Sequence, residues 1–118
     1  YTCSYPISHS EMFTRSHEIF GSDFDAEFEK DSDALIDVNY FKKLFAPALE
    51  VAEKFNVPLY CGEYGVIELA DPESAVNWYR HIHSVLDKYG IGRAMWSYKS
   101  MDFGLSDGLL SGITDKIV

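Results

Sequence analysis

The chain has 118 residues, of which 47% are hydrophobic and 25% are charged. This length suits one domain rather than two, and the composition is typical of a globular protein in water. The formal net charge of −9 argues against nucleic acid as a partner, because an acidic surface repels a polyanion. No apolar run approaches the ~20 residues that a membrane-spanning helix requires, so we expect no membrane partner.

The chain carries two cysteines, Cys3 and Cys61. Two are too few for a disulfide scaffold, and they lack the paired spacing of a zinc site. We therefore interpret both as buried thiols. The chain opens on Tyr1 with no visible signal peptide, so its true N-terminus and its cellular location are unknown from the sequence.

The first third of the chain has little apolar periodicity. We expect residues 1–21 to be irregular, as the end of a strand running into a long loop. Residues 22–37 are crowded with carboxylates, as in a calcium loop, but the turn glycine and the final bidentate Glu are not at the required offsets. The sequence therefore favours a solvated acidic loop or a helix start over a calcium site.

Helical periodicity begins at residue 38, where apolar residues recur three and four positions apart: Val38, Phe41, Leu44 and Phe45. Proline clashes inside a helix but suits its first position, so Pro47 predicts a division. We expect one helix to end at about Phe45 and a second to run from Pro47 to Phe55. Asn56 fits the helix end, and Pro58 prevents continuation.

The second half of the chain predicts a strand, a helix and another strand. Residues 59–64 form a short apolar run, and residues 94–98 form a similar one. Between them, Asp71 and Pro72 open a helix that ends at Gly90. Its apolar stripe comprises Val76, Tyr79, Ile82, Leu86 and Tyr89. A crossover of this length implies parallel strands, so we predict an α/β fold.

One carboxylate stands at a position that suits chemistry. Glu63 ends the first of these strands between Gly62 and Gly65, which let the backbone turn sharply and approach a ligand. Trp96 occupies the same end of the next strand, so the two side chains should be neighbours. A glycosidase needs such a pair, because a carboxylate attacks the anomeric carbon while an indole stacks on the sugar ring. Alternatively, Glu63 caps a helix or pairs with Arg93, and Trp96 belongs to the core.

The segment Asn56-Val57-Pro58-Leu59-Tyr60-Cys61-Gly62-Glu63-Tyr64-Gly65 resembles the seventh-strand signature of glycoside hydrolase family 5, the cellulase and mannanase family. Residues 44–49 resemble the helix before that strand. Residues 95–99, followed by residues 102–105, resemble the eighth strand with its subsite tryptophan and the loop after it. The resemblance implies that residues 1–118 form a single partial (β/α)8 TIM-barrel domain, covering about strands six to eight and the C-terminal part of a longer enzyme.

The resemblance also implies residue roles. Glu63 takes the place of the catalytic nucleophile and Trp96 that of the subsite tryptophan. Tyr5, in Cys3-Ser4-Tyr5, stands where the family has a His-x-Tyr whose tyrosine hydrogen-bonds the nucleophile. Near Trp96, Lys99 is a candidate to reach a sugar hydroxyl, or it is a plain surface lysine. The family's general acid/base follows an asparagine, and no Asn-Glu pair occurs in this chain.

The resemblance therefore implies part of a retaining glycoside hydrolase that acts on β-1,4-linked polysaccharide or oligosaccharide, either β-glucan or mannan, without a cofactor. The alternatives are a non-catalytic carbohydrate-binding module and a plain structural α/β fragment. His81 and His83 lie on different faces of their helix, so they form no metal pair. We expect the isolated chain to be inactive, and to cover its open strand edges either by associating with copies of itself or by remodelling a terminal segment over them. Only the resemblance suggests a secreted protein.

Overall fold

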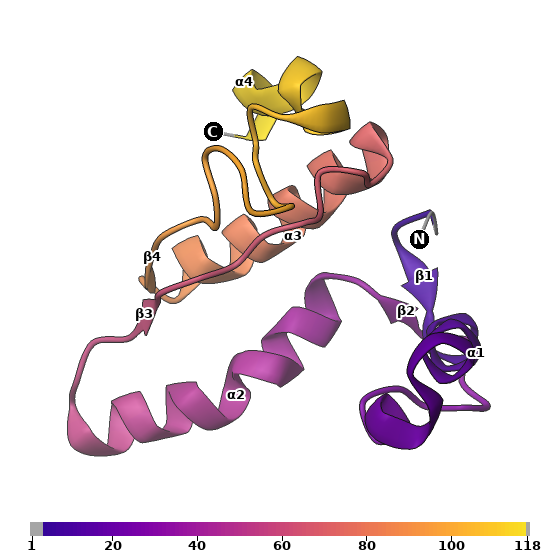
Figure 1. Cartoon of the computed structure of the whole chain (residues 1–118). Helices are drawn as coiled ribbons and strands as arrows, with labels where there is room; N and C mark the ends of the chain where they lie inside the picture. The colour runs from indigo at the N-terminus through magenta and orange to yellow at the C-terminus, as the bar shows by residue number, and fades with distance from the viewer. Residues whose placement is uncertain (1–3, 118) are drawn as a thin grey trace.

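The computed structural model describes residues 4–117, which form a mixed α/β structure (Figure 1). Its elements in chain order are β1 (Ile7–Ser8), α1 (His9–Phe20), the 3-10 helix η1 (Gly21–Phe24), β2 (Leu35–Ile36), α2 (Val38–Phe55), β3 (Tyr60–Cys61), α3 (Pro72–Lys88), β4 (Gly92–Arg93), the 3-10 helix η2 (Gly108–Ile113) and α4 (Thr114–Ile117). None of the helices in the described range is long and apolar enough to cross a bilayer.

The predicted strand–helix–strand unit is present. β3 and β4 pair in parallel, with Tyr60 opposite Gly92 and Cys61 opposite Arg93, and α3 connects them. β3 covers only Tyr60 and Cys61 of the predicted residues 59–64. β4 ends at Arg93, before the predicted residues 94–98 begin, so the predicted position of the second strand is wrong. β1 pairs with β2 and is antiparallel to it, so parallel pairing alone does not describe the fold.

α3 supplies more of the buried core than any other element. Four members of its predicted apolar stripe are buried, namely Val76, Tyr79, Ile82 and Leu86. The fifth, Tyr89, is exposed, because the helix ends at Lys88 and Tyr89 forms its C-cap. At the other end, the Asp71 carboxylate accepts the Ser74 N–H at 2.8 Å, and this hydrogen bond lowers the pKa of Asp71.

The predicted division of the second helix is wrong, because α2 runs unbroken from Val38 to Phe55 with Pro47 inside it. Proline removes one backbone hydrogen bond, but the apolar face of α2 packs on both sides of it. Phe41 is buried in the core before Pro47, and Leu49 packs against the core after it. Asn56 ends the helix in the left-handed conformation, with φ of 51°, as the sequence predicts.

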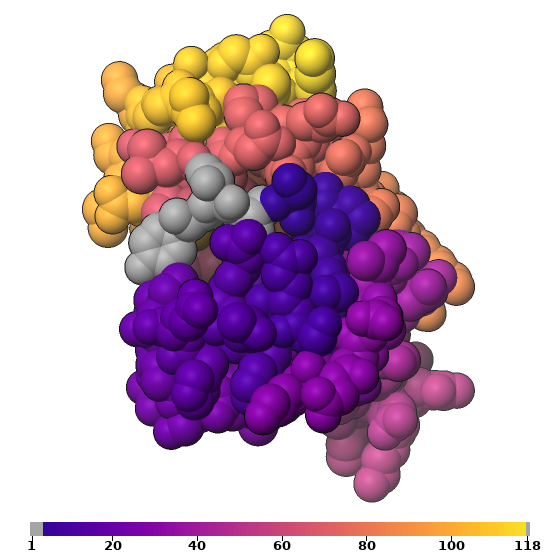
Figure 2. Space-filling model, turned by 90° about the vertical axis from the view of Figure 1, so that its right-hand side faces the viewer, coloured from indigo at the N-terminus to yellow at the C-terminus, as the bar shows by residue number. Residues whose placement is uncertain are grey.

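The N-terminal segment is also more ordered than expected. Residues 9–20, predicted to be irregular, form α1, which the Ser8 hydroxyl caps by accepting the Glu11 N–H at 3.2 Å. α1 has one buried residue, Ser16, while its apolar residues Met12, Phe13, Ile19 and Phe20 are half-buried or exposed. Figure 2 shows this segment, in indigo, beside α2, whose C-terminal end projects from the rest of the molecule.

The structure also bears on the predicted thiols and on the acidic segment. Cys61 is half-buried rather than buried, while Cys3 lies outside the described residues. Within residues 4–117, no group of His, Cys, Asp or Glu side chains could hold a metal ion. The acidic segment after α1 continues as η1, a loop and the short strand β2.

Candidate active site

The chain around Glu63 contains one extra residue relative to the parallel segment with which it pairs. The Ala94 N–H donates to the Cys61 carbonyl at 3.0 Å, and the next bond joins the Trp96 N–H to the Tyr64 carbonyl at 2.8 Å. Between these two hydrogen bonds the chain advances three residues on the β3 side, from Cys61 to Tyr64, but only two on the β4 side, from Ala94 to Trp96. One extra residue on one of two paired segments defines a β-bulge. Bulges re-aim side chains and are frequent beside active sites. Glu63 lies within this bulge.

Glu63 has no structural partner of its own in the described part of the chain. Its side chain is exposed, and no hydrogen bond or ion pair of its carboxylate occurs within residues 4–117. Arg93 pairs instead with Asp87, at 2.5 Å, and the cap of α3 comes from Asp71. Neither of the two structural roles considered for Glu63 is therefore observed.

Trp96 lies beside the segment that carries Glu63. Its backbone bond to Tyr64 holds the two chains together, and its own carbonyl approaches Gly65 so closely that a Cβ there would collide with it. The Trp96 side chain is 40% exposed, and the peptide bond that follows it, to Ser97, is cis. The exposed indole and the exposed Glu63 carboxylate are thus carried by two hydrogen-bonded segments, and such a pair is expected at a sugar subsite.

Tyr5 does not make the hydrogen bond that the resemblance implies. Its hydroxyl pairs with Nδ1 of His81 at 2.8 Å, and its backbone N–H donates to the Ser74 hydroxyl at 3.0 Å. Both partners are on α3, and among residues 4–117 Tyr5 forms no bond with Glu63. Burial, and to a smaller extent the Asp37 carboxylate, raises the pKa of Tyr5, so the phenol remains neutral.

Lys99 lies in the loop that follows Trp96. Its side chain is exposed, and its carbonyl accepts the Ser97 hydroxyl at 3.3 Å. The loop folds back on itself, since the Ser97 N–H donates to the Phe103 carbonyl and the Leu105 N–H donates to the Ser97 carbonyl. This keeps Lys99 at the same end of the sheet as Trp96, although no contact fixes its ammonium group there.

Sequence reasoning missed the polar contacts that connect α3 to the Glu63 segment. The Tyr64 hydroxyl and His83 Nε2 are 2.8 Å apart, and the Tyr79 hydroxyl accepts the Val66 N–H at 3.2 Å. His83, considered from the sequence only as a metal ligand, is half-buried in a cleft with Tyr64 and Arg93. Its four-residue spacing from Tyr79 was the available signal, since such pairs share a helix face.

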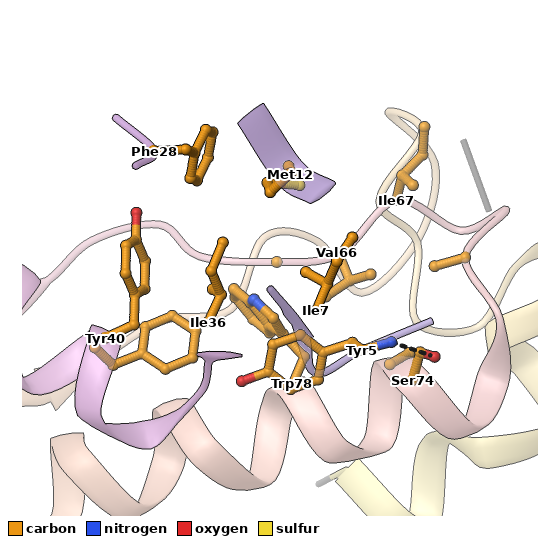
Figure 3. A pocket seen from close by; sticks show the side chains of 14 residues that line it. Tyr5, Ile7, Met12, Phe28, Ile36, Tyr40, Val66, Ile67, Ser74 and Trp78 are labelled. Carbon is orange, nitrogen blue, oxygen red and sulfur yellow. Dashed lines mark hydrogen bonds between the residues drawn. The ribbon is translucent and has the colours of Figure 1, made fainter. Parts of the chain in front are cut away.

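A separate cavity of about 350 Å³ opens between the N-terminal segment, α2 and the start of α3 (Figure 3). Its wall includes Tyr5, Ile36, Tyr40, Val66 and Trp78, and none of the described residues that line it is charged. Glycoside hydrolysis requires carboxyl groups, so this apolar cavity is not a candidate active site. The chemistry is better placed at Glu63.

Comparison with known proteins finds endoglucanases that are similar to part of this chain. No model of a known protein family matches the chain. Endoglucanase C from Acetivibrio thermocellus is 50% identical to it over 62 residues, which cover 52% of this chain and 18% of that protein. The resemblance to glycoside hydrolase family 5 is confirmed.

Solved structures of cellulases support the fold. A hyperthermophilic endo-β-1,4-glucanase, solved in complex with substrate, is 34% identical, with a TM-score of 0.55, over 59% of this chain and 22% of its own. Thermotoga maritima Cel5A, solved with mannotriose, matches 99% of this chain and 38% of its own, with a TM-score of 0.59 and 21% identity. The second match shows a shared fold alone. In each comparison the matched region is a minor part of the cellulase.

Proposed function

We propose that this chain is the nucleophile-bearing part of a retaining β-glycosidase barrel of family 5, with Glu63 as the nucleophile. The observation that carries the proposal is the position of Glu63. It lies in a bulge at the carboxyl end of a parallel strand, and its carboxylate has no partner among residues 4–117. The next residue, Tyr64, accepts a hydrogen bond from the Trp96 N–H. Functional groups gather at this end of the strands in α/β barrels.

The proposed reaction proceeds in two displacements. A carboxylic acid protonates the glycosidic oxygen while the Glu63 carboxylate attacks the anomeric carbon, so the leaving chain departs and a glycosyl-enzyme ester forms. Water, deprotonated by the same acid/base, then attacks that carbon and releases Glu63. The two carboxyl groups must lie ~5–5.5 Å apart. The acid/base would come from a part of the enzyme outside these 118 residues, because no Asn-Glu pair occurs here.

The substrate proposed is a β-1,4-linked glucan. The endo-β-1,4-glucanase solved with substrate shares 34% of its residues with this chain in the matched region, whereas the mannotriose complex shares 21%. Trp96 would stack under one sugar ring at the cleavage site, and Lys99 would donate to a hydroxyl beside it. Tyr5, the other substrate contact that the sequence predicts, lines the separate apolar cavity, so we do not assign it to this subsite. Mannan is the second choice of polymer.

The test is a nucleophile replacement in the full-length enzyme that contains this chain. Glu63→Gln should abolish release of reducing ends from soluble β-1,4-glucan while oligosaccharide binding, measured by calorimetry, persists. In Glu63→Ala, azide should restore cleavage of an aryl β-glycoside, because a small anion can replace the missing carboxylate. Glu68→Gln, an acid in the loop that follows, is the matched control and should retain turnover. Turnover by Glu63→Gln would remove Glu63 from the nucleophile role, and binding without hydrolysis by the wild type would favour a binding module.

A further inference from the structure

α3 holds the segment after Glu63 at two points, one on each side of Gly65. The Tyr64 hydroxyl is hydrogen-bonded to His83 Nε2 at 2.8 Å, and the Val66 N–H donates to the Tyr79 hydroxyl at 3.2 Å. Tyr79 and His83 are four residues apart, so they project from one face of α3. The same face of α3 is therefore hydrogen-bonded to both ends of the segment from Tyr64 to Val66.

The segment from Tyr64 to Val66 is connected to both proposed site residues, Glu63 and Trp96. The Tyr64 carbonyl accepts the Trp96 N–H at 2.8 Å, so a shift of Tyr64 also displaces the tryptophan. Glu63 directly precedes Tyr64, and its carboxylate has no partner among residues 4–117. Its position is therefore set by its own backbone, and that backbone is anchored through the tyrosine.

The ring of Tyr64 is closely packed. The side chain of Tyr64 is 9% exposed, and its ring meets those of Tyr79 and His83 edge-on at centroid distances of 6.2 and 5.6 Å. Its ring also stacks with Trp78 at 6.5 Å. Ring packing alone would let the ring slide within its plane, whereas the hydroxyl bond to His83 stops that movement.

We propose that His83 is a positioning residue for Glu63, acting through the Tyr64 hydroxyl. The inference rests on the proposed function, in which Glu63 is the nucleophile. A nucleophile must lie in line with the anomeric carbon, and a misplacement of ~1 Å can reduce turnover by about 100-fold. His83 touches neither substrate nor reacting atoms, so its contribution is geometric.

The surroundings of His83 keep this bond intact near neutral pH. The groups that face the imidazole are Tyr64 and Arg93 from the strand side and Tyr79 and Asp87 from α3. Burial, then the Arg93 guanidinium, lowers the pKa of His83, while Asp87 opposes them. A neutral imidazole retains an acceptor nitrogen for the phenol, which a protonated ring lacks.

The experiment compares three variants with the wild type. Tyr64→Phe removes the hydroxyl and keeps the ring, and His83→Gln retains an amide that can bond the phenol. In residues 1–118, amide hydrogen exchange at Trp96 should be about 2- to 10-fold faster in Tyr64→Phe, the change expected for one lost hydrogen bond. In the full-length enzyme, kcat should fall about 10- to 100-fold with KM unchanged. His83→Gln should show smaller changes in both.

Ser84→Ala is the matched control, because Ser84 is on the same helix and its hydroxyl bonds the His81 carbonyl instead. It should match the wild type in both measurements. Unchanged exchange at Trp96 in Tyr64→Phe overturns the proposal whether or not the enzyme is active. Faster exchange with unchanged kcat also overturns it, since the bond would then serve the fold alone. A wild type that does not hydrolyse glucan refutes the proposed function, and the exchange measurements in Tyr64→Phe and His83→Gln together still decide whether His83 holds the segment.

Discussion

The Tyr64 carbonyl accepts the Trp96 N–H at 2.8 Å, and this bond joins the two segments that resemble the family signature. It falls after an extra residue on the β3 side, so Glu63 lies in a bulge rather than in the ladder. Gly65 then passes so close to the Trp96 carbonyl that it has no room for a side chain. Glu63 and Trp96 therefore share one locally determined backbone arrangement.

Gly65→Ala should disrupt this arrangement. The added methyl group would collide with the carbonyl oxygen of Trp96 and lie 3.2 Å from its carbonyl carbon, and moving either chain apart would break the bond to Tyr64. Overpacking of this kind costs about 1–3 kcal/mol. The free energy of unfolding of residues 1–118, measured in urea, should fall by that amount.

The control for this change is Gly112→Ala in η2. A methyl group there would meet no atom within 4 Å. Its free energy of unfolding should stay within about 0.5 kcal/mol of the wild type, as for other exposed substitutions. Equal stability of the two variants would show that Gly65 is not closely packed against Trp96.

Trp96→Ala and Trp78→Ala should separate binding from folding, because the two tryptophans have different environments. Trp96 is 40% exposed and forms no ring contact with any described aromatic residue. Trp78 packs edge-on against Phe41 at 5.5 Å and Tyr79 at 5.2 Å. We expect Trp96→Ala to weaken oligosaccharide binding by about 1–3 kcal/mol, the value of a comparable flat-face contact, with little change in Tm.

Trp78→Ala should do the opposite and destabilise the fold, on the order of 3 kcal/mol. Calorimetric titration of the full-length enzyme with cello-oligosaccharides measures the first effect, and thermal unfolding measures the second. If Trp96→Ala unfolds the protein while wild-type binding to sugars is absent, Trp96 is a core residue and not a sugar platform.

The parts of the fold that the sequence predicts well are those with a strong local pattern. Three such features are present in the structure: the apolar stripe of α3, the cap of α3 by Asp71 and the end of α2 at Asn56. In each, the residue occupies the conformation or environment that its type favours. The parallel pairing of β3 and β4 follows from the length of the crossover. These features depend on a few neighbouring residues, so they are readable from the chain alone.

The features that the sequence did not reveal depend on contacts between distant segments. α1 buries only Ser16 fully, and His9 at its start packs edge-on against Tyr40 of α2 at 5.7 Å. α2 tolerates Pro47 because packing offsets the missing hydrogen bond. The bulge after β3 and the bond between Tyr64 and His83 follow from tertiary packing, which no local pattern encodes.

Stability should fall below about pH 6.5 because of His83. Burial and Arg93 lower its pKa in the folded state from the ordinary value of 6.5. The unfolded chain then binds the proton more readily than the folded one, so its contribution is intact above pH 6.5 and is lost as the pH falls through 6.5 towards the lower folded value. Urea unfolding between pH 8 and pH 5 measures this loss.

The variant His83→Gln should have a shallower pH dependence over that range, because its amide does not titrate. Ser84→Ala, also on α3, should retain the slope of the wild type. Parallel pH profiles for His83→Gln and the wild type would assign the acid sensitivity to other groups and contradict the prediction.

Purified residues 1–118 should be inactive on β-glucan and should associate. α2 exposes Leu44, Val51 and Phe55 on one face, since they are seven and four residues apart, and β3 and β4 each pair with one strand among the described residues. Exposed apolar faces and unpaired strand edges favour association between copies. Light scattering should give a mass above 13.4 kDa, and Leu44→Glu with Val51→Glu should reduce it. Lys43→Glu, an exposed polar position on the same helix, is the control and should leave the mass unchanged. A monomeric wild type would refute the association, and hydrolysis of glucan by this chain alone would require a second catalytic carboxylate within it.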